Sequence, residues 1–149
     1  MTQIILDTII NAPIQKVFDL SLDIDFHTQS ASQTKEEAIA GVTSGQIGLG
    51  ETVTWRGKHF GVWLRHTSII SEHKSPNFFV DEMIKGRFKR FRHEHHFRES
   101  GKQTHMQDIL TYETPYGFIG KTLDRLLLKK HLTQFLKIRN SRLKNALEL

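Results

Sequence analysis

The amino-acid sequence predicts an α+β fold, in which a curved antiparallel sheet of about seven strands surrounds a long C-terminal helix. Three observations indicate this fold. A β-type run at the N-terminus stops at a proline, a series of β-type runs fills residues 38–112, and residues 121–149 contain neither proline nor glycine. Short connections between the β-type runs favour antiparallel neighbours, and no helix-length segment separates them. A doubly wound parallel sheet is therefore disfavoured.

The first elements are a strand and two short helices. Residues 3–10 are rich in β-branched side chains and are followed by Asn11 and Pro13, which suit a helix cap and a first helical position. Apolar side chains then recur at helical spacing, at Ile14, Val17 and Phe18. This helix is short, and a second turn or short helix is predicted to begin around Asp23.

Six further strands and one long helix complete the predicted order. The strands are predicted at residues 37–42, 52–58, 62–71, 78–84, 88–98 and 104–113. The helix is predicted over residues 118–147. Its apolar face is made of Leu123, Leu126, Leu127, Leu132, Phe135, Leu136, Leu143 and Leu147. We expect this face to pack on the sheet. The sequence contains no internal repeat or linker, so one domain is predicted over residues 1–149.

Several motifs occur along the chain in a recognisable order. They are IINAPIQKVFD at residues 9–19, GLGETVTW at 48–55, FRHEHHF at 91–97, and Asp108 and Tyr112 before Pro115 and the final helix. On these residues the sequence resembles the START-like superfamily, also called SRPBCC, and within it the small proteins of polyketide cyclase/dehydrase type. The resemblance spans nearly the whole chain. It implies the helix-grip fold and an internal cavity for a lipid-, sterol- or polyketide-like molecule.

Alternation along the strands predicts which side chains line that cavity. Within residues 91–97, Phe91, His93, His95 and Phe97 share one face, and the charged side chains share the other, which belongs in water. Along residues 78–84 neither face is wholly apolar, so the sequence leaves open which face lines the cavity. It also leaves open whether Trp63 or Leu64 lines the cavity together with His66. The predicted ligand-binding residues are Trp55, Trp63, His66, Phe79, Asp81, Met83, Phe91, His93, His95, Phe97, Met106, Asp108, Leu110, Tyr112 and Leu127.

This composition predicts a site for a small apolar or amphipathic ligand, without a cofactor. Aromatic and aliphatic walls suit such a molecule, and His93, His95, Asp108 and Tyr112 would orient its polar groups. The alternative is an enzyme, a cyclase or dehydratase in which a His and Asp pair acts as acid and base. A metal site of His66, His93, His95 and Asp108 is a third possibility. The spacing of these residues matches no diagnostic metal motif, so we expect no metal.

Charge and cysteine content restrict the remaining classes. The net charge is +5 and the pI is about 9.6, with basic residues concentrated in residues 86–100 and in the last thirty. Solvated outer faces explain such residues, and a surface binder of nucleic acid or membrane is less favoured. The sequence has no cysteine, no signal-peptide pattern and no membrane-spanning run. We expect a cytoplasmic protein; the pattern does not indicate an oligomeric state.

Overall fold

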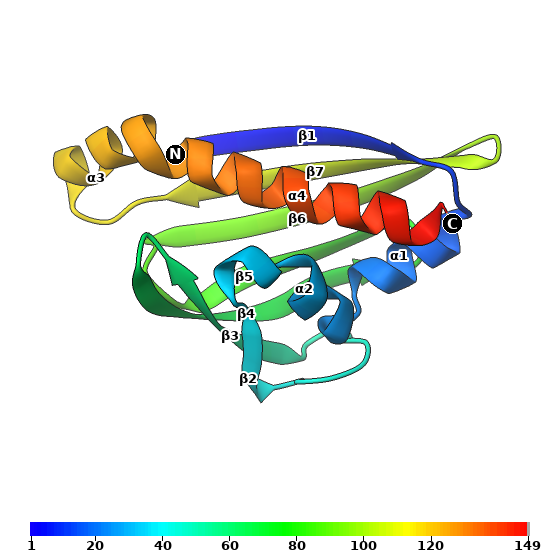
Figure 1. Cartoon of the computed structure of the whole chain (residues 1–149), viewed down its shortest axis with the longest axis horizontal. Coiled ribbons are helices and arrows are strands. Elements are labelled where there is room, and N and C mark those ends of the chain that lie inside the picture. The colour runs from blue at the N-terminus through cyan, green and yellow to red at the C-terminus, as the bar shows by residue number, and fades with distance from the viewer. Residues whose placement is uncertain (149) are drawn as a thin grey trace.

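The computed structural model describes residues 1–148 and contains one curved, seven-stranded antiparallel sheet (Figure 1). The strands lie in the order β1-β7-β6-β5-β4-β3-β2. Their bounds are β1 Thr2–Ile10, β2 Glu37–Gly41, β3 Thr52–His59, β4 Val62–Lys74, β5 Phe78–Lys85, β6 Arg90–Ser100 and β7 Gln103–Glu113. The predicted fold class is confirmed, and all seven strands are found. The largest differences are at β4, which ends three residues later than predicted, and at β6, which begins and ends two residues later than predicted.

Two short helices, α1 (Ile14–Ser21) and α2 (Ile24–Ser30), follow β1, and a short 3-10 turn, η1 (Ser32–Thr34), leads to β2. Pro13 is the residue before α1 and has the extended backbone that a helix N-cap adopts. The Asp23 carboxylate caps α2 by accepting a hydrogen bond from the Phe26 amide at 2.8 Å. Both helices begin within one residue of the predicted positions. The prediction that Asn11 caps α1 and that Pro13 is its first helical residue is wrong, because Pro13 is itself the N-cap and no side chain of residues 1–148 caps this helix.

The C-terminal helix consists of three consecutive segments, and its first turns depart from the prediction. They are α3 (Gly117–Leu123), a π-helical turn η2 (Asp124–Leu128) and α4 (Lys129–Leu147). A π turn contains an extra residue, so it rotates the side chains before it relative to those after it. Leu136 and Leu143 of α4 are buried, as expected. The prediction that Leu123, Leu126 and Leu127 pack on the sheet is wrong, because all three are exposed.

The interior has two apolar clusters on the concave side of the sheet, which α4 crosses (Figure 1). The larger cluster joins α1 to the sheet through Phe18, which packs edge-on against Phe79 and Phe97, and it also includes Ile24 of α2. The smaller one joins Leu110 of β7 to Leu136 of α4. Within residues 1–148, no helix is both long and apolar enough to cross a membrane.

Candidate functional site

A cavity of about 320 Å³ lies between the concave face of the sheet and α4. Most of its wall is apolar, and this part comes from α2, the sheet and α4. Its larger side chains are Ile24, Trp55, Leu64, Ile70, Phe79, Phe91, Leu110, Leu128, Leu132, Phe135 and Leu136. The space is in the size range of small-molecule sites.

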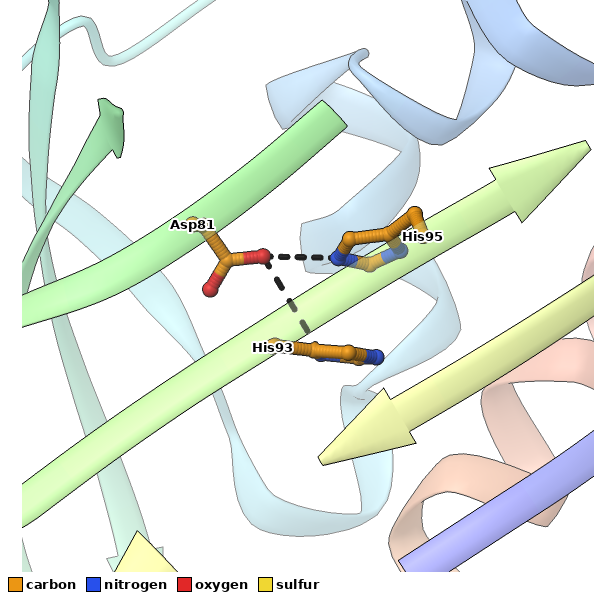
Figure 2. Close-up of side chains that lie close together, drawn as sticks. All are labelled: Asp81, His93 and His95. Carbon is orange, nitrogen blue, oxygen red and sulfur yellow. Dashed lines mark hydrogen bonds and ion pairs between the residues drawn. The ribbon is translucent and has the colours of Figure 1, made fainter. Parts of the chain in front are cut away.

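The polar part of the wall includes Asp81 of β5 and His93 and His95 of β6, which lie close together (Figure 2). These residues are connected to the Asp108 carboxylate of β7, which lies outside the wall. His95 Nε2 lies 2.7 Å from Asp81 Oδ2, and His93 Nε2 lies 2.8 Å from Asp108 Oδ1. The two imidazole rings stack, with their centroids 3.8 Å apart. Residues at i and i+2 of one strand point to the same face, so β6 presents both rings to the cavity.

Asp108 is the innermost member of this group and is fully buried. Besides the bond to His93, its carboxylate accepts hydrogen bonds from Arg139 at 2.6 Å and from Asn140 at 2.7 Å. Burial raises the pKa of Asp108, but the Arg139 charge and the His93 bond outweigh it and hold the pKa far below its usual range. Asp108 is therefore a buried anion, neutralised by an arginine from α4.

Asp81 lies at the cavity surface. Burial raises its pKa, but the hydrogen bond from His95 and the nearby histidines lower it to about 2. Burial also lowers the pKa of His95 to about 4, and the neighbouring His93 adds to this effect. Near neutral pH, Asp81 is an anion and His95 is neutral, so the proton on His95 belongs on Nε2, where it is donated to Asp81. His95 Nδ1 then has no hydrogen-bond partner among the described residues.

Two further histidines in the wall are kept neutral by burial. The pKa of His27 falls to about 4, and that of His66 also falls. The His27 ring packs on Trp55, with centroids 4.1 Å apart, and the His66 ring packs edge-on against Phe91. Both rings therefore add flat, uncharged surface to the cavity.

Within residues 1–148, the group of side chains nearest to a metal-binding arrangement is Asp81, His93 and His95, whose possible ligand atoms lie within 4.8 Å of one another. A shared metal ion requires the in-plane lone pairs of two imidazoles to converge. The two rings are stacked at an interplanar angle of 28°, so their lone pairs run side by side. Both rings are also engaged by carboxylates. The arrangement suits a hydrogen-bond network better than a metal centre.

The structure places eight of the predicted site residues on the cavity wall. They are Trp55, His66, Phe79, Asp81, Phe91, His93, His95 and Leu110. Four more point to the interior but lie outside the wall: Phe97, Met106, Asp108 and Tyr112 are buried in the surrounding core.

Three predicted site residues lie elsewhere, and their placement in the wall is wrong. Trp63 is on the outer face of β4, where the Arg56 guanidinium stacks on it at 4.1 Å. Alternation from His66 leads to Leu64, which does line the cavity. Met83 lies near the β5–β6 turn beside Gly86. Leu127 is turned outward in the π turn.

Important wall residues were not predicted. His27 and Ser68 carry no motif, although Ser68 follows from alternation with His66. Phe135 was assigned to the apolar helix face but not to the site. Arg139 was counted among the basic residues of an outer face, whereas its side chain turns inward to Asp108. Helical spacing distinguishes this arginine from the exposed Lys137, because Arg139 stands three residues after Leu136 and four before Leu143, on the apolar face.

The architecture and the enclosed cavity define a protein with the START-like helix-grip fold. Solved structures of the same fold include the protein TTHA0849 from Thermus thermophilus, with 21% identity, 97% and 99% of the two chains covered and a TM-score of 0.76. A START superfamily protein from Mycobacterium smegmatis has 13% identity, 97% and 98% coverage and a TM-score of 0.73. The major latex-like protein 151 from Panax ginseng has 13% identity, 98% and 97% coverage and a TM-score of 0.71.

The predicted resemblance is confirmed at the level of the fold by these structures. No protein-family model matches the sequence, and no curated protein matches it. The likeness to solved structures is low in identity and therefore shows the fold alone.

Proposed function

We propose that the protein binds a small, largely apolar molecule in the cavity between the sheet and α4. The observation that carries this proposal is the cavity itself, about 320 Å³ with a mainly aromatic and aliphatic wall. A space of this size, closed by aromatic side chains on both sides, favours a flat or aliphatic ligand. Apolar surface buried there contributes roughly 25 cal/mol per Å², before the costs of ordering the ligand.

The polar part of the wall sets which polar groups the ligand carries. The Asp81 carboxylate is a hydrogen-bond acceptor at the cavity surface near neutral pH, whereas His95 Nδ1 is buried and lies 3.5 Å from Asp108 Oδ1, away from the ligand. A hydroxyl or phenol group on an apolar frame would satisfy Asp81 by donating a hydrogen bond, whereas a ligand carboxylate would be repelled by it. The proposed ligand class is therefore an apolar alcohol, sterol or phenol.

Filling the cavity tests the proposal. Ser68 is buried in the centre of β4 and lines the cavity, so Ser68→Phe places a ring in the space that the ligand would occupy. We expect this variant to bind an uncharged fluorescent apolar probe, N-phenyl-1-naphthylamine, about tenfold or more weakly, which corresponds to 1.4 kcal/mol. Fluorescence titration measures the affinity. The matched variant Ser44→Phe, on the exposed loop before β3, is expected to bind the probe as the unaltered protein does. Equal affinity of Ser68→Phe and the unaltered protein would rule out this cavity as the binding site.

A second candidate function is acid and base catalysis on a ketone-containing ligand. It is favoured by the His93 and Asp108 pair: the buried carboxylate accepts the proton of His93 Nε2 and thereby leaves Nδ1 as a base within the cavity wall. Such a base could remove a proton from the carbon next to a carbonyl, the first step of a cyclisation or dehydration.

Deuterium exchange next to the carbonyl of an aromatic methyl ketone, followed by NMR, measures this activity directly. We expect the protein to accelerate the exchange, and His93→Gln to lower the rate by about a hundredfold, the smaller end of general-base contributions. His96→Gln, on the outer face of the same strand, should leave the rate unchanged. Identical rates with and without the His93 imidazole would exclude it as the base.

A further inference from the structure

The strongest feature outside the cavity is an exposed apolar surface on the first turns of the C-terminal helix. We call it the α3 patch, and it consists of Tyr116, Phe118, Ile119, Leu123, Leu126 and Leu127. Phe118 is 84% exposed and Tyr116 is 80% exposed. Scattered apolar residues are normal on a protein surface, but six large ones on a single short segment indicate an interaction site.

The fold holds these side chains outward. The buried Asp124 carboxylate accepts hydrogen bonds from the Tyr112 and Thr2 hydroxyls, which attach the π turn to β7 and β1. On the same inner side, a Cβ on Gly120 would meet the Pro115 carbonyl oxygen at 1.9 Å, so only glycine allows this close approach. With Gly120 and Asp124 facing inward, the leucines between and after them face solvent.

Basic side chains surround the apolar ones. Lys121, Arg125, Lys129 and Lys130 are exposed, while the acidic residue of this segment, Asp124, is buried. None of the four basic side chains forms an ion pair with another described residue. An apolar surface with free positive charges on its border matches an interface whose outer layer is anionic and whose inner layer is apolar.

The α3 patch and the β3–β4 turn lie at the same end of the molecule (Figure 1). Pro115, immediately before α3, and Leu128, at the end of the π turn, both line the cavity. Phe60 in the β3–β4 turn is exposed, also lines the cavity and packs against His131 of α4, with ring centroids 4.5 Å apart. Phe60 and Tyr116 both have a left-handed backbone, which is unfavourable for a bulky residue. Two aromatic side chains are thus presented at this end at a cost in conformational energy.

We propose that the α3 patch docks onto the surface of an anionic lipid bilayer, with the end of the cavity that Phe60, Pro115 and Leu128 line turned toward the membrane. The apolar side chains would enter the boundary between headgroups and acyl chains, and the four basic residues would contact anionic headgroups. A symmetric contact with a second copy would bring the same positive charges together, and a nucleic acid offers no apolar surface for six such side chains. The bilayer is the partner that satisfies both properties.

Co-sedimentation with vesicles tests this docking. Vesicles of phosphatidylcholine with about one-third phosphatidylserine should bind the protein, and vesicles of pure phosphatidylcholine should bind it markedly less. Binding should also weaken in about 1 M salt, where the Debye length is about 3 Å. Phe118→Ser with Ile119→Ser should reduce partitioning about tenfold or more, because two large apolar side chains are removed from the interface. Lys121→Glu with Arg125→Glu should reduce it by at least about fivefold for each charge.

Three control variants separate this surface from the rest of the protein. Ile5→Ser removes an exposed apolar side chain from β1, and Lys102→Glu reverses an exposed charge in the β6–β7 turn at the opposite end of the molecule. Ser68→Phe fills the cavity without touching the patch, so it separates docking from ligand binding. All three should bind vesicles as the unaltered protein does.

Three results would overturn the proposal. The first is failure to bind the anionic vesicles at low salt. The second is an equal loss of binding in the patch and control variants. The third is a concentration-dependent dimer, seen by light scattering, that Phe118→Ser with Ile119→Ser abolishes, because the patch would then be a contact between copies of this chain.

Discussion

Replacing Arg139 by methionine is expected to lower the free energy of unfolding by about 3–5 kcal/mol. The Arg139 guanidinium lies 2.6 Å from Asp108, whose carboxylate is fully buried. Methionine keeps most of the side-chain volume but leaves the buried carboxylate without its neutralising charge. Urea unfolding followed by circular dichroism measures the loss.

A second substitution and a control variant test whether the stability loss comes from the uncompensated Asp108 charge. Adding Asp108→Leu to Arg139→Met removes the uncompensated charge, so the double variant should regain most of the lost stability. Lys137→Met, on the exposed side of the same helix, should change stability by no more than about 0.5 kcal/mol. A loss below about 1 kcal/mol for Arg139→Met would contradict the assignment of Arg139 as the counter-ion of Asp108.

Lowering the pH from about 6.5 to 4 is expected to destabilise the protein by several kcal/mol, through His27 and His95. Burial lowers the pKa of each to about 4, whereas in the unfolded chain each titrates near 6.5. The unfolded state therefore binds protons first as the pH falls. The contribution of the two neutral histidines is fully present above pH 6.5 and is lost as the pH approaches 4. Each pKa unit corresponds to about 1.4 kcal/mol, so each histidine accounts for up to about 3 kcal/mol.

Unfolding free energies measured between pH 7 and pH 4 for three variants test this dependence. His27→Gln and His95→Gln should each flatten the decline in this window, since glutamine does not titrate. His96→Gln, on the outer face of β6, should keep the slope of the unaltered protein. The low pKa of Asp81 belongs to a different window, because its contribution is lost only below about pH 4. An unchanged slope in both buried-histidine variants would show that neither ring is kept neutral by burial.

Residues 91–97 show how much of the site could be read from the sequence. Alternation places Phe91, His93 and His95 on one face and the charged residues on the other, and the structure has this arrangement. The same reasoning fails for Trp63, where two adjacent large apolar residues offer both faces and only pairing with the neighbouring strands decides between them. Along β5, where both faces are mixed, Phe79 and Asp81 face the cavity because of their position opposite β6.

By itself, the sequence determined the order of elements, the class of fold and the apolar and histidine-rich face of β6, because these depend on local propensity and on a period of two residues. Only the tertiary structure decided the pairing of Arg139 with Asp108, the outward turn of Leu123, Leu126 and Leu127, and the volume of the cavity. The helical pattern repeats every 3.6 residues, so it shows which residues share a face but not where a π turn rotates that face. Likewise, helical spacing places Arg139 on the apolar face with Leu136 and Leu143, but the buried carboxylate that neutralises its charge comes from a strand about thirty residues earlier.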